Sequence, residues 1–180
     1  MTVIFLNGCT SAGKSSIARE LQSNLPEHYL LTGIDDAFAM LPPKLHGHKD
    51  GFYFDRDDAN RVRLNFGAFG LATLKAHRRA CAAIAKSSVN LILDEVVLAQ
   101  DMAEDWISIF EAIDVFWVGV HCRLEELNRR EIARGDRIHG QAEGQYDIVH
   151  KHLEYDFEID TSDKPPSACA AEIMSAFAQR

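Results

Sequence analysis

The chain has 180 residues, of which 47% are hydrophobic and 26% charged, a composition typical of one globular domain with a sizeable core. A formal net charge of -8 disfavours duplex nucleic acid and anionic membranes as main partners, because both require clustered cations. The four cysteines form no Cys-x-x-Cys pair, and the short N-terminal apolar run predicts neither a signal peptide nor a membrane span. We therefore expect a cytoplasmic protein, folded as one domain over residues 1–180, that acts on a small molecule. Its oligomeric state is left open.

The first predicted element is a buried strand at residues 3–7, and a phosphate-binding motif follows it directly. The pattern G-x-x-x-x-G-K-[ST] is matched by Gly8-Cys9-Thr10-Ser11-Ala12-Gly13-Lys14-Ser15. Its glycines let the backbone wrap around an anion, with the intervening amide groups pointing inward. Lys14 supplies a charge for the outer phosphates, and Ser15 offers a hydroxyl to a magnesium ion. A glycine-rich turn without a ligand is the alternative.

A helix is predicted after this motif. Apolar residues recur at helical spacing and the pattern ends before Pro26. The positive end of that helix would add to the attraction for an anion. Residues 8–16, with Ser16 included, are therefore expected to bind the phosphates of ATP together with Mg²⁺.

Four further strand candidates alternate with helical patterns along the chain. The strands are expected at residues 29–34, 89–93, 115–120 and 155–160, and helices at about 71–86, 102–110, from 124 onward and from about 165. This alternation predicts right-handed crossovers and a three-layer α/β/α fold with a five-stranded, mostly parallel sheet. The last strand alternates apolar and acidic residues, which indicates an edge strand. Ligands of such sheets bind beyond the carboxyl ends of the strands.

Acidic residues stand at two of these strand ends. After the second strand, a carboxylate can orient an acceptor hydroxyl and take its proton, or cap the next helix. We assign the first role to Asp35 and the second to Asp36. Asp94 and Glu95 close the third strand, where an acidic group holds magnesium or lies in a solvated turn. Asp94 is the predicted metal residue beside Ser15, whereas Glu95 could face the acceptor.

A stretch dense in arginine follows the fourth strand. Arg130 and Arg134 are four residues apart on one helix face, and Arg137 lies just beyond the helix end. A lid at about residues 134–145 that closes over the phosphates would neutralise charge on the transferring group. We expect Arg130 and Arg134 to contact the nucleotide, and Arg134 and Arg137 to act in catalysis. The alternative is a solvated helix face with an ordinary Glu126–Arg130 pair.

Two pairs of histidines are less informative. His46 with His48, and His150 with His152, are near neighbours that could bind a metal ion. Two imidazoles without a carboxylate or thiolate partner make a weak metal site, so surface or core histidines are the expectation.

Several segments taken together resemble the chloramphenicol phosphotransferase family. They are the motif region at 6–15, Gly-Ile-Asp at 33–35, Leu-Asp-Glu-Val at 93–96, Phe-Trp-Val-Gly-Val at 116–120, Ala-Arg-Gly-Asp-Arg at 133–137 and Glu-Tyr-Asp-Phe-Glu-Ile-Asp-Thr at 154–161. Members of that family are P-loop kinases that transfer the γ-phosphoryl group of ATP to the primary hydroxyl of chloramphenicol. The resemblance implies that Asp35 is the catalytic base, that residues 8–15 hold the ATP phosphates, and that Arg134 and Arg137 belong to the lid.

The leading hypothesis is an ATP-dependent kinase that phosphorylates an alcohol hydroxyl of a small molecule, chloramphenicol or a similar compound. Residues 36–70 are expected to contact the acceptor, and their aromatic side chains favour an uncharged one. One alternative is a P-loop kinase for another small metabolite. A second is a nucleotide-dependent switch without transfer chemistry, which the absence of a guanine-reading Asn-Lys-x-Asp sequence disfavours.

Overall fold

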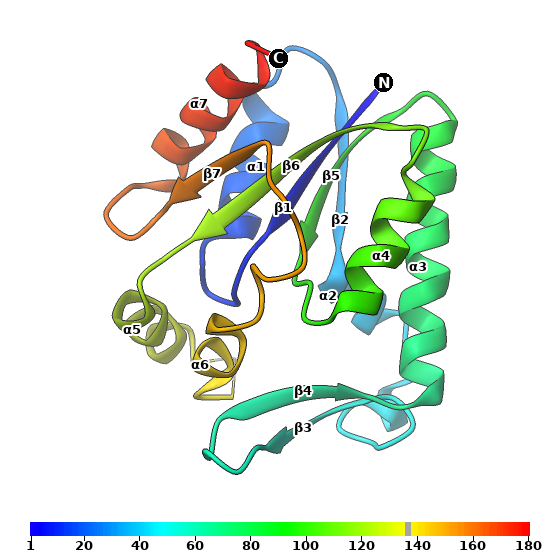
Figure 1. The fold of residues 1–180 in the computed structure, drawn as a ribbon, viewed down its shortest axis with the longest axis vertical. Helices are drawn as coiled ribbons and strands as arrows, with labels where there is room; N and C mark the ends of the chain where they lie inside the picture. Colours follow the sequence, from blue (N-terminus) through cyan, green and yellow to red (C-terminus); the bar gives the residue numbers. More distant parts are fainter. Residues whose placement is uncertain (136–137) are drawn as a thin grey trace.

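The computed structural model describes residues 1–135 and 138–180 and is built around a parallel sheet. Its five strands are β1 (Thr2–Asn7), β2 (Tyr29–Gly33), β5 (Asn90–Glu95), β6 (Asp114–His121) and β7 (Phe157–Asp160). They lie in the order β2-β5-β1-β6-β7, and every neighbouring pair is parallel (Figure 1). The predicted five-stranded parallel sheet is confirmed, and the alternating strand near the C-terminus is an edge strand, as expected.

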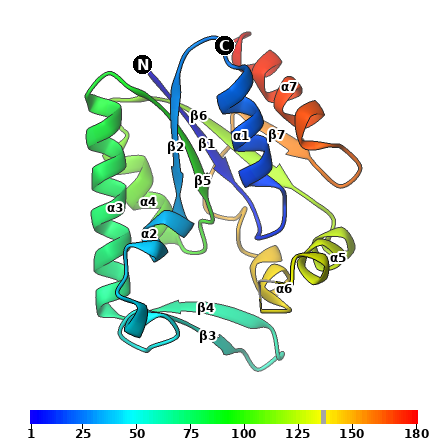
Figure 2. The ribbon, with the colours of Figure 1, turned by 180° about the vertical axis from the view of Figure 1, so that it is seen from behind.

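Helices cover both faces of this sheet. On one face lie α1 (Lys14–Asn24) and α7 (Pro166–Phe177), and on the other lie α3 (Ala68–Lys86) and α4 (Gln100–Ile109) (Figures 1 and 2). The three layers of the predicted α/β/α fold are therefore present. Of the helices in the described part of the chain, none is both long and apolar enough to cross a membrane.

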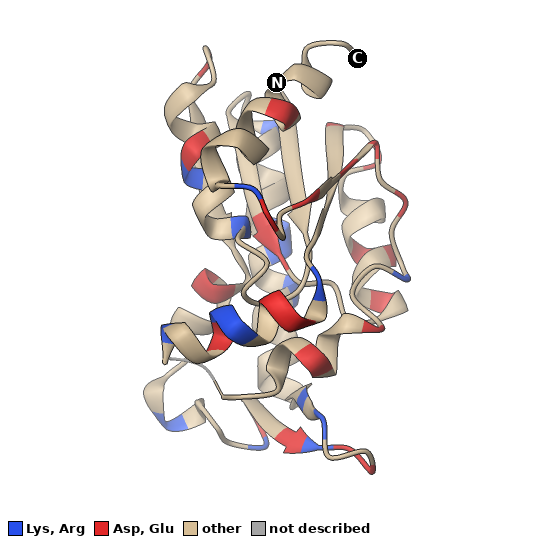
Figure 3. Cartoon of the chain, turned by 90° about the vertical axis from the view of Figure 1, so that its left-hand side faces the viewer, with Lys and Arg blue, Asp and Glu red and all other residues tan. Residues whose placement is uncertain are grey.

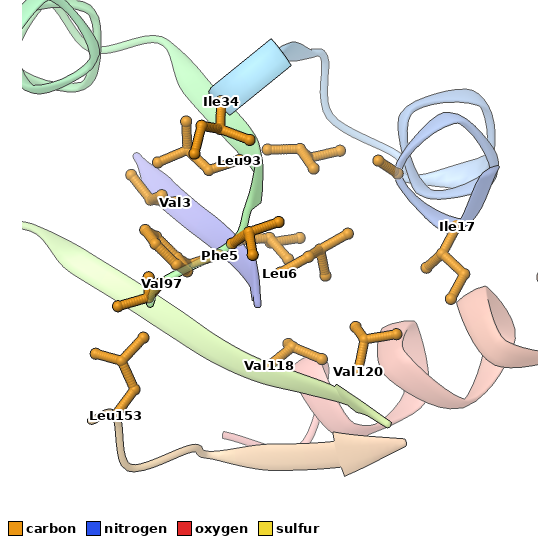
Figure 4. Close-up of a cluster of buried hydrophobic side chains, with 14 of the residues drawn as sticks. Val3, Phe5, Leu6, Ile17, Ile34, Leu93, Val97, Val118, Val120 and Leu153 are labelled. Carbon is orange, nitrogen blue, oxygen red and sulfur yellow. The ribbon is translucent and has the colours of Figure 1, made fainter. Parts of the chain in front are cut away.

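The core lies between the sheet and the helices, with β1 at its centre. Because β1 is covered on both faces, residues 3–6 form one apolar run with no exposed side chain. Phe5 packs edge to face against Trp106 of α4, with ring centroids 5.2 Å apart. Ile17 of α1 enters the cluster from the other face of the sheet (Figure 4). This packing fixes the carboxyl ends of the strands, where polar residues gather.

Further elements lie beyond the carboxyl ends of the strands. They are α2 (Ile34–Ala39), a short 3-10 helix (Pro43–Leu45), a hairpin of β3 (Phe52–Arg56) and β4 (Val62–Phe66), α5 (Leu124–Arg134) and α6 (Gln141–Tyr146). Among these the sequence predicts α5, and the capping role given to Asp36 implies a helix where α2 lies. Figure 1 places the hairpin, α5 and α6 at the end of the molecule toward which the strands point, opposite the two chain termini.

The hairpin docks on α6 through direct backbone contact. Val62 of β4 is buried, and a Cβ atom added at Gly144 would overlap the Val62 carbonyl oxygen. Beside this contact the Arg63 guanidinium donates a hydrogen bond to the carbonyl oxygen of Gly144. At its other end the hairpin packs on α2, where the rings of Phe38 and Phe52 lie 4.3 Å apart. The hairpin forms a two-stranded sheet of its own, so these contacts set its position.

One of the paired histidines is packed into the structure. The ring of His150 stacks on that of His121 with centroids 3.9 Å apart, and its Nδ1 lies 2.8 Å from the Tyr155 hydroxyl. That hydroxyl accepts a hydrogen bond from the Asn7 amide at 2.7 Å. Burial, with His121 and Lys14 nearby, lowers the pKa of His150 to about 4. His150 is therefore a packed histidine, one of the two environments expected for these residues.

Gly144→Ala should destabilise the fold, because the new methyl group would overlap the Val62 carbonyl oxygen and push β4 away from α6. We expect the free energy of unfolding to fall by about 1–3 kcal/mol, the range for overpacked sites. Urea denaturation measures it. Glu143→Ala, at the exposed neighbouring position, is the control and should change stability by less than about 0.5 kcal/mol. Equal effects of the two substitutions would contradict the docking contact.

His150 should make the protein sensitive to acid. The pKa of His150 is about 4 in the folded chain, below its ordinary value of 6.5, so the unfolded state binds the proton first. Stability is therefore lost as the pH falls from about 6.5 to about 4. His150→Gln should flatten this part of the stability curve, measured by thermal melting, whereas His28→Gln at an exposed histidine should not. Parallel curves for the wild-type protein and His150→Gln would show that His150 plays no such part.

Candidate functional site

The phosphate-binding motif forms a tight loop between β1 and α1. Ser11 and Gly13 have positive φ values of 61° and 91°, so the chain turns back on itself before α1 begins at Lys14. Gly8 is required by packing, since a Cβ atom there would overlap the carbonyl oxygen of Val120 in the neighbouring strand β6. The start of the loop therefore lies directly against the sheet.

Lys14 is held in place by the loop and by the end of β5. Its Nζ donates a hydrogen bond to the carbonyl oxygen of Cys9 at 2.9 Å and lies 3.7 Å from Asp94 Oδ1. The side chain is only 6% exposed, so its charge occupies a defined position. Burial raises the pKa of the Cys9 thiol to about 12, which makes this residue a packed, protonated side chain.

The two residues predicted for magnesium are in direct contact. Ser15 Oγ donates a hydrogen bond to Asp94 Oδ2 at 2.5 Å, because the carboxyl ends of β1 and β5 lie side by side. Hydroxyl and carboxylate oxygens are ligands that suit Mg²⁺. Within residues 1–135 and 138–180, no group of three or more His, Cys, Asp or Glu side chains could hold a metal ion. A cation at Ser15 and Asp94 would complete its shell with water and phosphate oxygens.

The loop also offers donors that fit a polyphosphate. Ser11 Oγ is buried and has no hydrogen-bond partner among the residues that the structure describes, although Ser11 lines the same cavity as Lys14. A buried polar atom left without a partner costs free energy, and a bound oxyanion would remove that cost. The left-handed turns, the amide groups and the start of α1 supply further positive dipoles.

One cavity of about 480 Å³ brings most of the predicted residues together. From the motif it is lined by Thr10, Ser11, Gly13, Lys14, Ser15 and Ser16. Three motif residues are instead buried outside the cavity lining, namely Gly8, Cys9 and Ala12. Predicted residues from other elements that line it are Asp35, Asp36, Asp94 and Arg134. Its apolar wall consists of Leu31, Ile34, Phe38, Phe54, Leu64 and Val96.

The two acidic residues of α2 differ in their surroundings. Asp36 Oδ2 accepts hydrogen bonds from the Gly33 amide at 2.9 Å and from the Thr32 hydroxyl at 2.8 Å, so Asp36 caps the start of α2. Asp35 is exposed in the first turn of the helix and lines the cavity together with Lys14. The Asp35 carboxylate and the phosphate loop would therefore both face a molecule bound in this cavity.

Glu95 points away from the cavity. It is 2% exposed and does not contribute to the cavity lining. Burial raises the pKa of its carboxyl to about 8, although the Arg78 guanidinium acts in the opposite direction. The expectation that Glu95 could face the acceptor is therefore wrong: side chains alternate along β5, and the residue after Asp94 turns into the interior.

The three predicted arginines stand in different positions. Arg134, in the last turn of α5, lines the cavity. Arg130 does not line it, because its guanidinium bonds to Glu126 Oε1 and to the carbonyl oxygen of Thr161, both at 2.7 Å. Arg137 lies outside the described residues.

The surface of α5 carries the ion pairs expected of a solvated helix face. Hydrogen bonds from Arg129 and Arg130 lower the pKa of Glu126 to about 2. Acidic and basic residues are interspersed on this side of the molecule (Figure 3). Arg130 nevertheless also approaches the phosphate loop, since its Nη1 lies 3.8 Å from the position of a Cβ atom at Gly13. Arg130 thus forms the expected surface ion pair with Glu126 and also lies close to the phosphate loop.

Two glutamines of α6 line the cavity and were missed by the sequence reasoning. Gln141 and Gln145 are 6% and 7% exposed, and Gln145 Oε1 accepts a hydrogen bond from the Thr10 amide at 2.7 Å. Glutamine belongs to none of the motifs considered. The sequence carries no signal for them, because their place in the cavity depends on the contacts of α6 with the loop and the hairpin.

Comparison with known proteins gives the family. The family of chloramphenicol phosphotransferase-like proteins matches residues 1–178. Two Mycobacterium tuberculosis proteins, from strains CDC 1551 / Oshkosh and ATCC 25618 / H37Rv, are each 32% identical over 183 residues, which cover 97% of this chain and 81% of theirs. Their names assign them provisionally as O-phosphotransferases.

Solved structures with the same fold include several kinases. M. tuberculosis APS kinase CysC, in complex with AMPPNP and APS, has a TM-score of 0.69 at 14% identity and covers 98% of this chain and 97% of its own. Shikimate kinase from Aquifex aeolicus has a TM-score of 0.61 at 15% identity, with 98% and 96% covered. These likenesses confirm the predicted P-loop kinase fold. With the match over nearly its whole length, the chain belongs to the chloramphenicol phosphotransferase-like family.

Proposed function

We propose that the chain is an ATP-dependent kinase that transfers the γ-phosphoryl group to an alcohol hydroxyl of a small, uncharged molecule, chloramphenicol or a similar compound. The observation that carries the proposal is a single cavity lined by the phosphate loop, by the hydrogen-bonded Ser15 and Asp94, and by Asp35. The family and the P-loop kinase fold support phosphoryl transfer as the reaction class.

The nucleotide would occupy the phosphate loop. Bound ATP would supply the transferable phosphoryl group, with Mg²⁺ neutralising part of its charge. The loop amides and the Ser11 hydroxyl would hold phosphate oxygens, and Lys14, fixed by the Cys9 carbonyl, would face the outer ones. Ser15 and Asp94 would hold the cation from the protein side.

Asp35 is the proposed general base. A hydroxyl held by its carboxylate would give up its proton as the hydroxyl oxygen bonds to phosphorus. Lys14 and Arg134, which line the same cavity, would stabilise the negative charge on the phosphoryl oxygens. Arg130 would act on the nucleotide side near the loop, and Arg137 would belong to the lid at about residues 134–145.

The lining that comes from the predicted acceptor segment favours an uncharged acceptor. The predicted acceptor segment, residues 36–70, contributes Phe38, Phe54 and Leu64 to the lining and no Lys or Arg. Two of its arginines are engaged within the hairpin region, since Arg61 and Arg63 donate to Asp57 Oδ2 at 3.0 and 2.9 Å. A carboxylated or phosphorylated acceptor would therefore meet no cation from this segment.

Acceptor-dependent formation of ADP tests the proposal. The protein would be incubated with Mg²⁺ and ATP and with chloramphenicol, other neutral alcohols, or carboxylated and phosphorylated alcohols. Turnover with a neutral alcohol supports the proposal, whereas turnover with charged alcohols alone favours a kinase for another metabolite. Binding of ATP without turnover on any acceptor favours a nucleotide-dependent switch and contradicts the kinase.

Asp35→Asn should lower kcat by about a hundredfold to ten-thousandfold, the usual contribution of a general base, while binding of ATP is kept. The amide fills the same space but carries no negative charge and cannot accept the proton. Steady-state kinetics and calorimetric titration with AMPPNP measure the two properties. Asp36→Asn is the control: its amide oxygen can still accept the hydrogen bond from the Gly33 amide, so the cap of α2 is kept and we expect a much smaller loss of kcat. An unchanged kcat in Asp35→Asn would remove Asp35 from the base role.

Asp94→Asn should raise the Mg²⁺ concentration needed for half-maximal activity by about tenfold or more, because it removes the carboxylate charge of the proposed metal site. Ser15→Ala should shift the curve in the same direction. Activity measured over a Mg²⁺ titration provides the test. Asp101→Asn, an exposed carboxylate on α4, is the control and should leave the curve in place. Superimposable curves for Asp94→Asn and Asp101→Asn would place the cation elsewhere.

A further inference from the structure

Gln145 lies at the junction between the phosphate loop and the hairpin. It follows Gly144, whose backbone contacts Val62 of β4. Its own Oε1 accepts a hydrogen bond from the Thr10 amide in the loop at 2.7 Å. In Figures 1 and 2, α6 lies between the carboxyl end of β1 and the hairpin. Helix α6 therefore contacts the hairpin through Gly144 and the phosphate loop through the side chain of Gln145.

The backbone of α6 is held at both ends. The carboxylate of Glu131 in α5, which is 1% exposed, accepts hydrogen bonds from the amides of Gly140 at 2.6 Å and Ala142 at 3.0 Å. Near the other end, the guanidinium of Arg63 donates to the carbonyl oxygen of Gly144. A side chain carried by this short helix therefore has a defined position relative to the loop.

The hydrogen bond to Thr10 also determines which way the amide of Gln145 faces. Because Oε1 accepts from the Thr10 amide, Nε2 with its two N–H donors lies on the other side of the amide carbon. The reverse orientation would set two donors against each other. Among the described residues Nε2 has no hydrogen-bond partner, and it is not enclosed by protein, since Gln145 lines the cavity. Its donors are therefore available to a bound molecule.

We propose that Gln145 Nε2 donates a hydrogen bond to an oxygen of the terminal phosphoryl group of ATP. The inference rests on the proposed function and adds to it a contact from outside the phosphate loop. The transferred group must pass from the loop to the acceptor wall, and Gln145 stands where α6 joins these two sides. A neutral amide can donate to an anionic oxygen without forming an ion pair with Asp35.

Gln145→Glu separates this contact from a structural role. Glutamate has the same shape and keeps an oxygen for the Thr10 amide, but it replaces the two donors with a negatively charged oxygen. Calorimetric titration without acceptor would compare AMPPNP, which carries a terminal phosphoryl group, with ADP, which lacks it. We expect the affinity for AMPPNP to fall by about tenfold to hundredfold and that for ADP by less than about threefold.

Gln141→Glu is the matched control. Gln141 lines the same cavity one turn earlier in α6 and is equally buried, so this variant brings the same charge to the same wall. It should change the ratio of the two affinities by less than Gln145→Glu does. Gln145→Met removes the donors without adding charge, and it also removes the oxygen that accepts from the Thr10 amide. If thermal melting shows that Gln145→Glu does not fold, Gln145→Met replaces it, with ADP, which uses the same loop, as the measure of any change in the loop itself. The proposal then requires the affinity for AMPPNP to fall more than that for ADP.

Two results would overturn the inference. One is an unchanged ratio of AMPPNP to ADP affinity in Gln145→Glu, and the other is an equal change of that ratio in Gln141→Glu. Failure of the proposed function would look different: the wild-type protein would bind both nucleotides and phosphorylate no acceptor, and the ratios would still decide for or against Gln145. A wild-type protein that binds neither nucleotide would overturn both.

Discussion

The hydrogen bond between Ser15 and Asp94 is the contact on which the arrangement of the cavity depends. It joins the first turn of α1 to the end of β5, and Lys14 lies 3.7 Å from the same carboxylate. The contact exists because β1 and β5 are neighbouring parallel strands, with Leu6 paired to Asp94. A shift of one residue in this register would turn the carboxylate to the other face of the sheet and separate it from the lysine.

A second set of contacts ties together the parts that do not belong to the sheet. Glu131 holds the start of α6, Gly144 meets the hairpin, and Gln145 reaches back to the phosphate loop. The phosphate side and the apolar side of the cavity are thus joined through one six-residue helix.

Much of the fold and part of the site could be predicted because their signals are local. The apolar run of β1 and the glycine-lysine motif identify the strand, the loop and α1, and the rule for parallel sheets places Asp35 and Asp94 at one edge. The hairpin and α6 are short, and their positions depend on contacts such as Arg63 with Gly144, 81 residues apart. The bond from Thr10 to Gln145 spans 135 residues and has no pattern in the sequence.

The separate two-stranded sheet has a consequence for how acceptor preference can change. Phe54 and Leu64 are direct cross-strand partners and both line the cavity, whereas Val62 on the same strand carries the docking contact. Alterations at the first two positions would reshape the apolar wall and leave the attachment intact. Under the proposed function, substitutions at Phe54 and Leu64 would change which alcohols fit the cavity, while the phosphate loop and the attachment of the hairpin stay as they are.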